Sequence, residues 1–434
     1  MINKKTLKNL FLNIIKSEIF RNTSILVSGT VLAQLVPILL QPVIRRVFLP
    51  EAFGVYSVYL SVIGIIITIT SLKFELAIVL PKKRVWAINL LGLTLVLSFI
   101  ICSILQLITI WKQESLNAFF NISSFYSNTI YFLPLGAFLI TINQNFNFFL
   151  IRQKDFLGSS INKVSRRAAE GVLQLTFGYS KVSYGLVFSD VIGNFVNLII
   201  AIFQSYRKGF SFRLINYKGM KEVAIQYQDY PRYNLIPSLL SASAFLLPVI
   251  IINKTFSAEM AGYFDLSKLL LSIPLALISR ALSNVLLQRV SAKYLQRESL
   301  LSDLKPIFYF VLLIALLEVL IVLLFGKSLF VLFFGQNWGF SGEISKTLVW
   351  SYALNFILAP FTDVLIALRK IKTYSYWQVS YFAAIISLFF LKSVSFTTFL
   401  LYFISIEIFC YIFLAILIFV QIRRYEDLVT KPVF

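Results

Sequence analysis

The sequence contains no histidine, which excludes histidine metal ligands, a serine–histidine–aspartate triad and a histidine proton relay. Its only cysteines, Cys102 and Cys410, both lie in apolar runs, so we expect neither a disulfide framework nor a redox pair. Charged residues make up only 14% of the 434 residues, against about 25% in a typical soluble domain. This shortage of charge excludes a soluble multidomain enzyme, and the apolar content excludes an intrinsically disordered chain.

Apolar and aromatic residues take the place of charge. Hydrophobic residues make up 58% of the chain and include 43 phenylalanines and 21 tyrosines, which predicts an integral membrane protein with many spans. The 40 Lys and Arg against 19 Asp and Glu fit the basic cytoplasmic loops of membrane proteins, so we expect no nucleic-acid partner. We find no glycine-rich phosphate loop and no cluster of metal ligands in the sequence. We therefore expect no cofactor, no metal and no enzymatic activity, with a proton or sodium gradient as the open choice of driving force.

Twelve apolar segments are long enough to cross a bilayer core of about 30 Å as helices. They are residues 24–44, 55–72, 86–111, 129–151, 158–178, 184–204, 234–252, 261–285, 306–334, 347–368, 376–391 and 397–420. The alternating connections hold 26 Lys and Arg on one side of the membrane and 8 on the other. Because positive residues gather on the cytoplasmic side, this split predicts twelve spans with both termini in the cytoplasm.

The predicted spans fall into two halves of six. We predict an amphipathic surface segment at 1–23, an N-terminal lobe at 24–206, a cytoplasmic linker at 207–232, a C-terminal lobe at 233–422 and a cytoplasmic tail at 423–434. Residues 46–54 match residues 254–262 in a basic residue, a Phe, a Glu and a Gly at equal offsets. Parallel repeats are related by an axis along the membrane normal and place a substrate site between the halves. The expected fold is all-α, with two pseudo-symmetric six-helix lobes around a central cavity.

The fifth predicted span carries the most unusual charges. Its polar residues recur at helical spacing and share one face; they are Ser160, Lys163, Arg166, Arg167 and Glu170. Three cations facing lipid would cost roughly 8–10 kcal/mol on insertion scales. We therefore interpret them as the cationic wall of a water-filled cavity. The alternative is a helix that starts later and leaves these residues among the cytoplasmic headgroups.

Other polar residues also lie within the predicted spans. Asn143 and Asn145, beside Gln144 and Asn147, either bind sugar hydroxyls or link helices by hydrogen bonds. Lys73 lies at the inner end of the second span, where snorkelling to the interface is an alternative to substrate contact.

Carboxylates within the spans are candidates for binding a coupling ion. They are Glu75, Asp190, Asp265, Glu318, Asp363 and Glu407. In a chain without histidine, proton coupling would have to use such groups. Structural hydrogen bonding is the alternative for each, and Asp265 could instead neutralise Lys268 one helical turn away.

Two stretches of the sequence resemble the signature of a known family. The first is Phe48-Leu-Pro-Glu-Ala-Phe-Gly-Val-Tyr-Ser-Val-Tyr59, continuing to Ser71-Leu-Lys-Phe-Glu-Leu-Ala-Ile-Val-Leu-Pro81. The second comprises Asp229-Tyr-Pro-Arg-Tyr233, Leu247-Pro248, Phe256-Ser-Ala-Glu-Met-Ala-Gly-Tyr263 and Leu287-Gln-Arg289. Both resemble bacterial polysaccharide flippases of the Wzx type, which translocate O-antigen and capsule repeat units and share a superfamily with the MATE drug exporters.

The resemblance implies a flippase that moves an undecaprenyl-pyrophosphate-linked oligosaccharide across the bacterial inner membrane by alternating access. Lys163, Arg166 and Arg167 would hold the pyrophosphate or acidic sugars, with Lys268 and Arg280 as their counterparts in the second half. The family usually has Arg where this chain has Lys73, so a bidentate phosphate clamp is not expected there. Other polysaccharide-export proteins would be its partners.

Two other functions stay open. A drug/cation antiporter is disfavoured by a cationic cavity, because its substrates are mostly cations themselves. A repeat-unit polymerase of the same pathway is similarly hydrophobic and of similar size, but the predicted topology leaves no large outward loop for catalysis.

Overall fold

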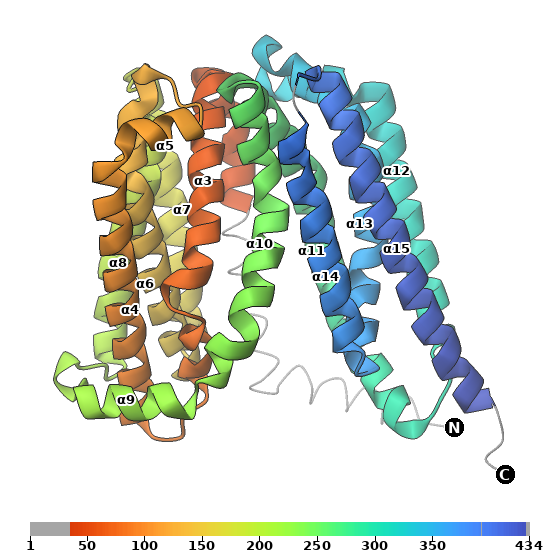
Figure 1. The fold of residues 1–434 in the computed structure, drawn as a ribbon, viewed down its shortest axis with the longest axis horizontal. Helices are drawn as coiled ribbons and strands as arrows, with labels where there is room; N and C mark the ends of the chain where they lie inside the picture. Colours follow the sequence, from red (N-terminus) through yellow and green to blue (C-terminus); the bar gives the residue numbers. More distant parts are fainter. Residues whose placement is uncertain (1–34, 392, 431–434) are drawn as a thin grey trace, which may run out of the picture. The chain divides into compact units, whose positions relative to one another are not determined.

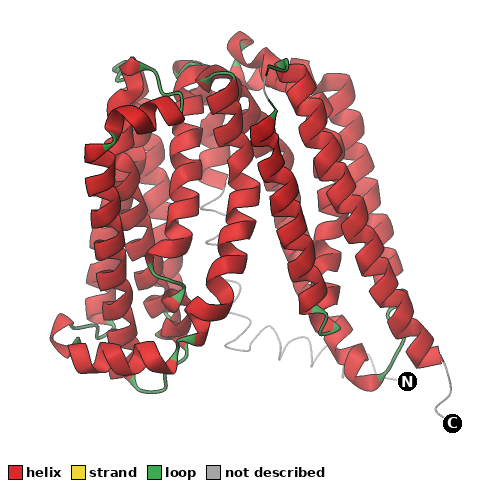
Figure 2. Cartoon of the chain, in the orientation of Figure 1, coloured by secondary structure: helices red, strands yellow, loops and turns green. Residues whose placement is uncertain are grey.

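The described residues, 35–391 and 393–430 of a computed structural model, form helices joined by loops, with no strand among them (Figure 2). The predicted surface segment 1–23, most of the first predicted span and the last four residues lie outside the described part. An all-α fold is therefore what this part of the chain adopts.

The chain divides into two compact units (Figure 1). The first holds the described residues through 48 together with 59–239, and the second holds 49–58 with 240–434. The helices up to the chain's midpoint are α3 (Pro50–Thr70), α4 (Arg84–Trp111), α5 (Gln113–Phe119), α6 (Phe132–Arg152), α7 (Phe156–Tyr179), α8 (Gly185–Arg207), α9 (Tyr217–Gln226) and α10 (Asp229–Thr255). Those after it are α11 (Ala258–Gln296), α12 (Leu301–Phe334), α13 (Gly339–Ala367), α14 (Ile371–Ile386) and α15 (Phe396–Thr430). Because α3 and α10 each contain a unit boundary, each is a continuous helix shared by both units.

Nine helices in the described part are long and apolar enough to cross a membrane, where the sequence predicts twelve spans. The first predicted span falls mostly outside the described residues. The fifth is the helix α7, whose four charges between Lys163 and Glu170 keep it too polar to count by composition. The eleventh is α14, which is an α-helix for only 16 residues before it tightens into a 3-10 turn. The chain is thus a multi-pass helical membrane protein, and the full count of twelve remains a prediction.

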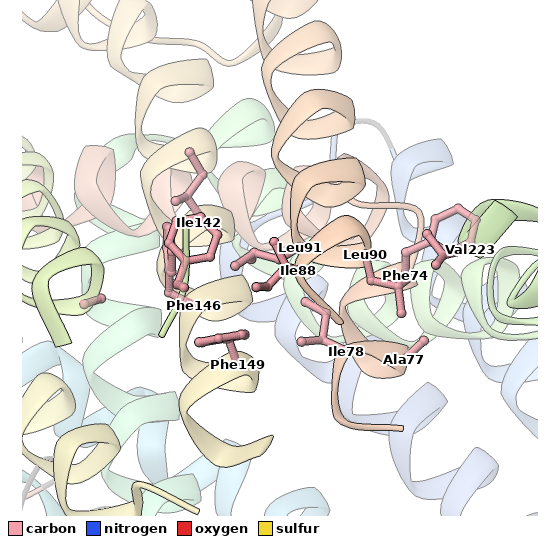
Figure 3. Close-up of a cluster of buried hydrophobic side chains, with 12 residues drawn as sticks. Phe74, Ala77, Ile78, Ile88, Leu90, Leu91, Ile142, Phe146, Phe149 and Val223 are labelled. Carbon is pink, nitrogen blue, oxygen red and sulfur yellow. The ribbon is translucent and has the colours of Figure 1, made fainter. Parts of the chain in front are cut away.

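An apolar cluster in the first unit holds α4 and α6 together (Figure 3). It collects side chains from the turn after α3, from α4, from α6 and from α9. Phe146 and Phe149 of α6 both meet Phe210 edge to face, with ring centroids 5.4 Å and 5.9 Å apart. Burying one such ring contributes about 1.5–3 kcal/mol relative to exposure in water. The cluster therefore fixes α6, and through it α8 and α7, which pack in sequence beside it.

Asn89 of α4 ties this helix to the connection that precedes α9. Its Nδ2 donates to the carbonyl oxygens of Val85 (2.9 Å) and Leu214 (3.2 Å), and its Oδ1 accepts from the Asn216 N–H (3.0 Å). The side chain is buried, so removing it deletes the hydrogen bonds that join α4 to this connection.

We predict that Asn89→Ala destabilises the protein by about 1–3 kcal/mol, because it removes three part-buried hydrogen bonds to the backbone. A lower midpoint of thermal unfolding in detergent checks this. Asn234→Ala, at an exposed position, is the matched control and leaves the midpoint unchanged. Equal midpoints for the two variants would contradict this role of Asn89.

The two matching segments of the sequence meet in the second unit. The helices that they begin, α3 at Pro50 and α11 at Ala258, start 208 residues apart, which is the offset of the repeat. A Cβ built on Gly54 would lie 1.6 Å from the Ala258 carbonyl oxygen, and one on Gly262 would lie 2.0 Å from that of Pro50. Each glycine thus packs against the backbone four positions before the other glycine. Only a residue without a side chain allows this approach.

Candidate functional site

The first unit contains a buried polar cluster on α7 and α8, which pack side by side (Figure 1). Asp190 of α8 is 1% exposed, and its carboxylate accepts from Arg166 Nη2 of α7 and from the Tyr59 hydroxyl of α3, both at 3.3 Å. Asn194 Nδ2, one turn along α8, donates to the same carboxylate at 3.1 Å. Asp190, which the sequence presents as isolated, is therefore the centre of a network.

The cations of α7 are paired more fully than the sequence indicates. Arg166 lies 3.3 Å from Asp190, and Arg167 Nη1 lies 2.8 Å from Glu170 Oε2 on the same helix. Lys163 lies half-buried on α7 between these pairs and the helix start. Both arginines of this helix are thus paired with a carboxylate. The Arg166 guanidinium is not saturated, because its Nε is buried and makes no hydrogen bond.

The amides of α6 divide between the two roles that the sequence leaves open. Asn143 Nδ2 donates to the Asn194 carbonyl oxygen of α8 (2.8 Å), and Asn147 Oδ1 accepts from Ser159 Oγ of α7 (2.5 Å), so both link helices. Asn145 is 0% exposed, and neither atom of its amide makes a hydrogen bond. Asn162 of α7 is also buried, and neither atom of its amide makes a hydrogen bond. These two amides have the unused donors and acceptors that a sugar hydroxyl requires.

Lys73 and Glu75 lie at the break after α3, in the first unit. Leu72 and Lys73 both adopt positive φ, 50° and 65°, which side-chain-bearing residues rarely do. Glu75 is buried and accepts from Ser71 Oγ at 2.5 Å, while the Lys73 ammonium lies 3.9 Å from it. The two residues therefore pair with each other at the end of the helix.

The second unit contains a different polar cluster, around Lys268 of α11. This lysine is only 9% exposed; its Nζ donates to the Phe245 carbonyl oxygen of α10 at 2.6 Å and lies 3.5 Å from the centre of the Phe245 ring. Glu407 of α15 lines the same cavity and accepts from the Tyr381 hydroxyl of α14 at 3.0 Å. The geometry brings together a lysine and a carboxylate 139 positions apart in the sequence.

The remaining candidates of the second unit do not join this cluster's cavity. Arg280 is exposed on α11, and Glu318 of α12 and Asp363 of α13 are half-buried. Asp265 is half-buried one turn before Lys268. No group of three or more carboxylates and thiols in the described part of the chain is arranged to hold a metal ion.

Several residues of these clusters escape prediction from the sequence. Tyr59, Asn194 and Tyr381 are ordinary for apolar spans, and Asn162 precedes the more conspicuous Lys163. Their partners lie on other helices, so only helix packing shows the contacts. A usable signal exists for Asn162, which lies four positions before Arg166 and so shares its helix face.

Residues 19–291 match a protein family described as Polysaccharide biosynthesis protein. This chain belongs to that family. The match covers more than half of the chain and includes both signature stretches, so it confirms the resemblance found in the sequence. Membership assigns the protein to membrane transporters of polysaccharide biosynthesis rather than to enzymes. A search of curated proteins gave no match.

Solved structures of MATE and other MOP superfamily transporters share the fold. One is described as the inward-facing conformation of a multidrug resistance MATE family transporter of the MOP superfamily (TM-score 0.71, 16% identity, 92% of this chain and 96% of that one). An outward-facing conformation under the same description has TM-score 0.61 and 15% identity, covering 95% and 96%. A MOP superfamily transporter from Pyrococcus furiosus, described as having a binding pocket of reverse polarity that suggests a different function, has TM-score 0.51 and 15% identity, covering 95% and 94%. At these identities the likeness shows the fold alone.

Proposed function

We propose that this polysaccharide biosynthesis protein is a flippase for a lipid-linked oligosaccharide. Its substrate is an undecaprenyl-pyrophosphate-linked repeat unit of an O-antigen, capsule or exopolysaccharide. The protein lies in the bacterial inner membrane with both termini in the cytoplasm, and it moves the sugar head outward by alternating access. Family membership supports the pathway, and the chemistry of the first unit supports the substrate.

The observation that carries the proposal is the unused hydrogen-bonding capacity of α6, α7 and α8. Asn145 and Asn162 have no partner for either amide atom, and Arg166 has a free Nε. An unsatisfied buried polar group costs about 1–3 kcal/mol, so a helical bundle gains nothing structural from several of them. Sugar hydroxyls and phosphate oxygens satisfy amides and guanidinium groups, respectively. A polar, negatively charged head group therefore suits this part of the unit.

The cations of α7 take the anionic part of the substrate in this proposal. Arg166 and Arg167 exchange their carboxylate partners for phosphate or acidic sugar oxygens, and Lys163 adds a third positive charge on the same helix. Arg280 of the second unit, which is exposed, offers a further cation. Lys268 is poorly suited to this task, because its ammonium is buried against Phe245.

Drug export is the second candidate that the fold allows, since the MATE structures share it. The three cations of α7 disfavour cationic drugs, and the reverse pocket polarity described for the Pyrococcus furiosus transporter shows that one fold accommodates different pockets. Family membership also disfavours a repeat-unit polymerase.

Reconstitution tests the proposal directly. Purified protein is placed in liposomes that contain an undecaprenyl-pyrophosphate oligosaccharide with a fluorescent sugar, and an impermeant reductant bleaches the outer leaflet. We expect the protected inner-leaflet signal to disappear only in liposomes that contain the protein. A protected fraction equal to that of protein-free liposomes, in vesicles shown to hold folded protein, would contradict the proposal.

A further inference from the structure

One end of the first unit is strongly basic. The helices α4, α6 and α8 each have an arginine as their terminal residue at this end, and α9 runs across it rather than along the spans (Figure 1). The segments that meet here, residues 82–84, 152–155 and 207–222, hold ten Lys and Arg against two carboxylates. The connections at the other end of these helices, residues 112–131 and 180–184, hold two Lys and Arg against one carboxylate. Positive charge is thus concentrated at one end of the unit.

The basic turn before α4 is held in place by contacts with the ends of α6 and α8. Arg152 Nη2 donates to the carbonyl oxygens of Pro81 (2.8 Å) and Lys82 (3.3 Å), which fixes the turn against the end of α6. The Arg84 guanidinium lies against Gly209, just after α8, where an added Cβ would lie 1.9 Å from Arg84 Nη2. The orientation of a membrane protein depends on the number of positive residues in a loop and does not require them to be fixed. These contacts therefore indicate a second role for the turn.

The two arginines at this turn, Arg84 and Arg152, lie close enough for their charges to repel each other. The carboxylate nearest to Arg152 in the sequence, that of Asp155, pairs with Lys208 at 3.4 Å. Like charges held together cost free energy, and a bound anion offsets that cost. Phosphate is a suitable anion, because a planar guanidinium donates two parallel hydrogen bonds to its oxygens.

Exposed apolar side chains lie beside these cations. Leu80 and Val85, on the two sides of the basic run 82–84, are both exposed. At the end of α8 the Arg207 guanidinium lies 4.3 Å from the centre of the exposed Phe203 ring. Cations that extend from apolar residues at the end of a span are typical of the membrane interface, where acyl chains meet headgroups. A lipid phosphate therefore fits this surface better than a soluble anion, which would leave the apolar residues in water.

The helix α9 has the composition of a helix that lies among headgroups. Its inner face packs on the unit through Val223, which is fully buried in the apolar cluster with residues of α4 (Figure 3). The exposed side chains of its outer face include Tyr217, Lys218, Lys221 and Ile225. Lysines beside exposed apolar and aromatic side chains are typical of helices in the plane of an anionic membrane surface.

We propose that this end of the first unit binds the phosphate groups of anionic phospholipids, with Lys82, Lys83 and Arg84 as the main contacts and α9 among the headgroups. Arg152 positions the turn that carries these three residues. The ligand is a phospholipid of the surrounding membrane. The proposal therefore does not depend on which lipid-linked molecule the protein transports.

A tryptophan beside the basic turn reports which lipids contact it. Trp86 lies half-buried in the first turn of α4, two positions after Arg84. Brominated acyl chains quench a tryptophan only on contact, so they report the lipids next to it. The test uses full-length protein in bilayers that mix phosphatidylglycerol with phosphatidylcholine, with one of the two lipids brominated at a time. Trp86 is kept as the only tryptophan by placing Phe at the other four positions, Trp111, Trp338, Trp350 and Trp377.

We expect phosphatidylglycerol to be preferred over phosphatidylcholine at Trp86 by at least about fivefold, the effect of one cation near an anionic lipid. Replacing Lys82, Lys83 and Arg84 together by Gln makes the two lipids quench equally. The matched control replaces three exposed cations of the second unit by Gln, namely Arg369, Lys370 and Lys372, and leaves the preference unchanged. A preference that persists in the 82–84 variant would overturn the proposal. Equal quenching by the two lipids before any cation is replaced would also overturn it and would favour an acidic protein as the partner.

A second measurement keeps the test decisive if the protein with one tryptophan does not fold. Protein with all five tryptophans is offered equal amounts of the two lipids in detergent, and the lipid that co-elutes with it from a size-exclusion column is measured. We expect an excess of phosphatidylglycerol, which the 82–84 variant reduces by half or more and the second-unit control does not. Salt at about 1 M, where the Debye length is about 3 Å, removes the excess. An excess that survives this salt, or that inorganic phosphate removes when chloride of equal ionic strength does not, would overturn the proposal.

Discussion

Cells that carry Arg166→Ala and Arg167→Ala together lose their surface polysaccharide to the level of a strain without the gene. These two guanidinium groups each pair with a carboxylate, and Arg166 retains an unsatisfied Nε for an anionic ligand. Without them, only Lys163 remains to compensate the phosphates on this helix. Quantitative staining of surface polysaccharide, normalised to the amount of protein in the membrane, measures the effect.

A loss of folding would also remove the surface polysaccharide, so the test must neutralise the carboxylates that pair with these arginines. Arg166→Ala alone leaves Asp190 as an unpaired buried charge, which costs about 3–5 kcal/mol. Adding Asp190→Asn and Glu170→Gln neutralises both carboxylates and restores the amount of folded protein, while transport stays lost. Arg289→Ala, at an exposed arginine that pairs with Asp303, is the matched control and retains normal polysaccharide. Normal polysaccharide in the quadruple variant would remove Arg166 and Arg167 from the site.

Gly54→Ala and Gly262→Ala each abolish accumulation of folded protein. The added Cβ atoms would lie 1.6 Å and 2.0 Å from backbone carbonyl oxygens, and backbone cannot rotate away as a side chain can. Ordinary overpacking costs about 1–3 kcal/mol, and we expect both variants to exceed this because the start of α3 or of α11 must move. Size-exclusion chromatography of fluorescently tagged protein in detergent measures the folded fraction.

Gly339→Ala is the matched control for these variants. Its Cβ would lie 3.2 Å from Val331 Cγ2, which is a side-chain atom rather than backbone and needs to give by only a few tenths of an ångström, and alanine favours the helix that begins there. We expect its folded fraction to equal that of the unmodified protein. Folded Gly54→Ala or Gly262→Ala protein at the same level would show that the close crossing of α3 and α11 is dispensable.

The sequence predicts most helices correctly, because runs of about 20 apolar residues have few alternatives in a membrane. Two predicted spans are helices in the structure but are not among the nine long apolar ones: polar residues interrupt α7, and α14 is short. The match between residues 46–54 and 254–262 corresponds to a direct contact in the fold, which the sequence alone does not predict. Its two glycines contact the paired segment directly.

The sequence predicts which polar residues lie within the spans, but it does not predict which of them pair with one another. Spacing along one helix shows that Arg166 and Arg167 share a face, but not that Asp190, 24 positions away, neutralises one of them. In the same way Asn143 and Asn145 are equivalent in the sequence, and only the position of α8 gives one of them a partner. Contacts between helices depend on rotation and register, which hydrophobic pattern constrains weakly in a bundle where polar residues are interior.

The most direct test of the flippase account is the leaflet in which completed lipid-linked repeat units accumulate in cells lacking this protein. Spheroplasts are treated with an impermeant glycosidase that cleaves the repeat unit, and the surviving lipid-linked material is measured. We predict accumulated repeat units that the enzyme cannot reach, because the sugars stay on the cytoplasmic side, together with loss of surface polysaccharide. Accumulated material that the enzyme digests, or unchanged polysaccharide without accumulation, would contradict the account.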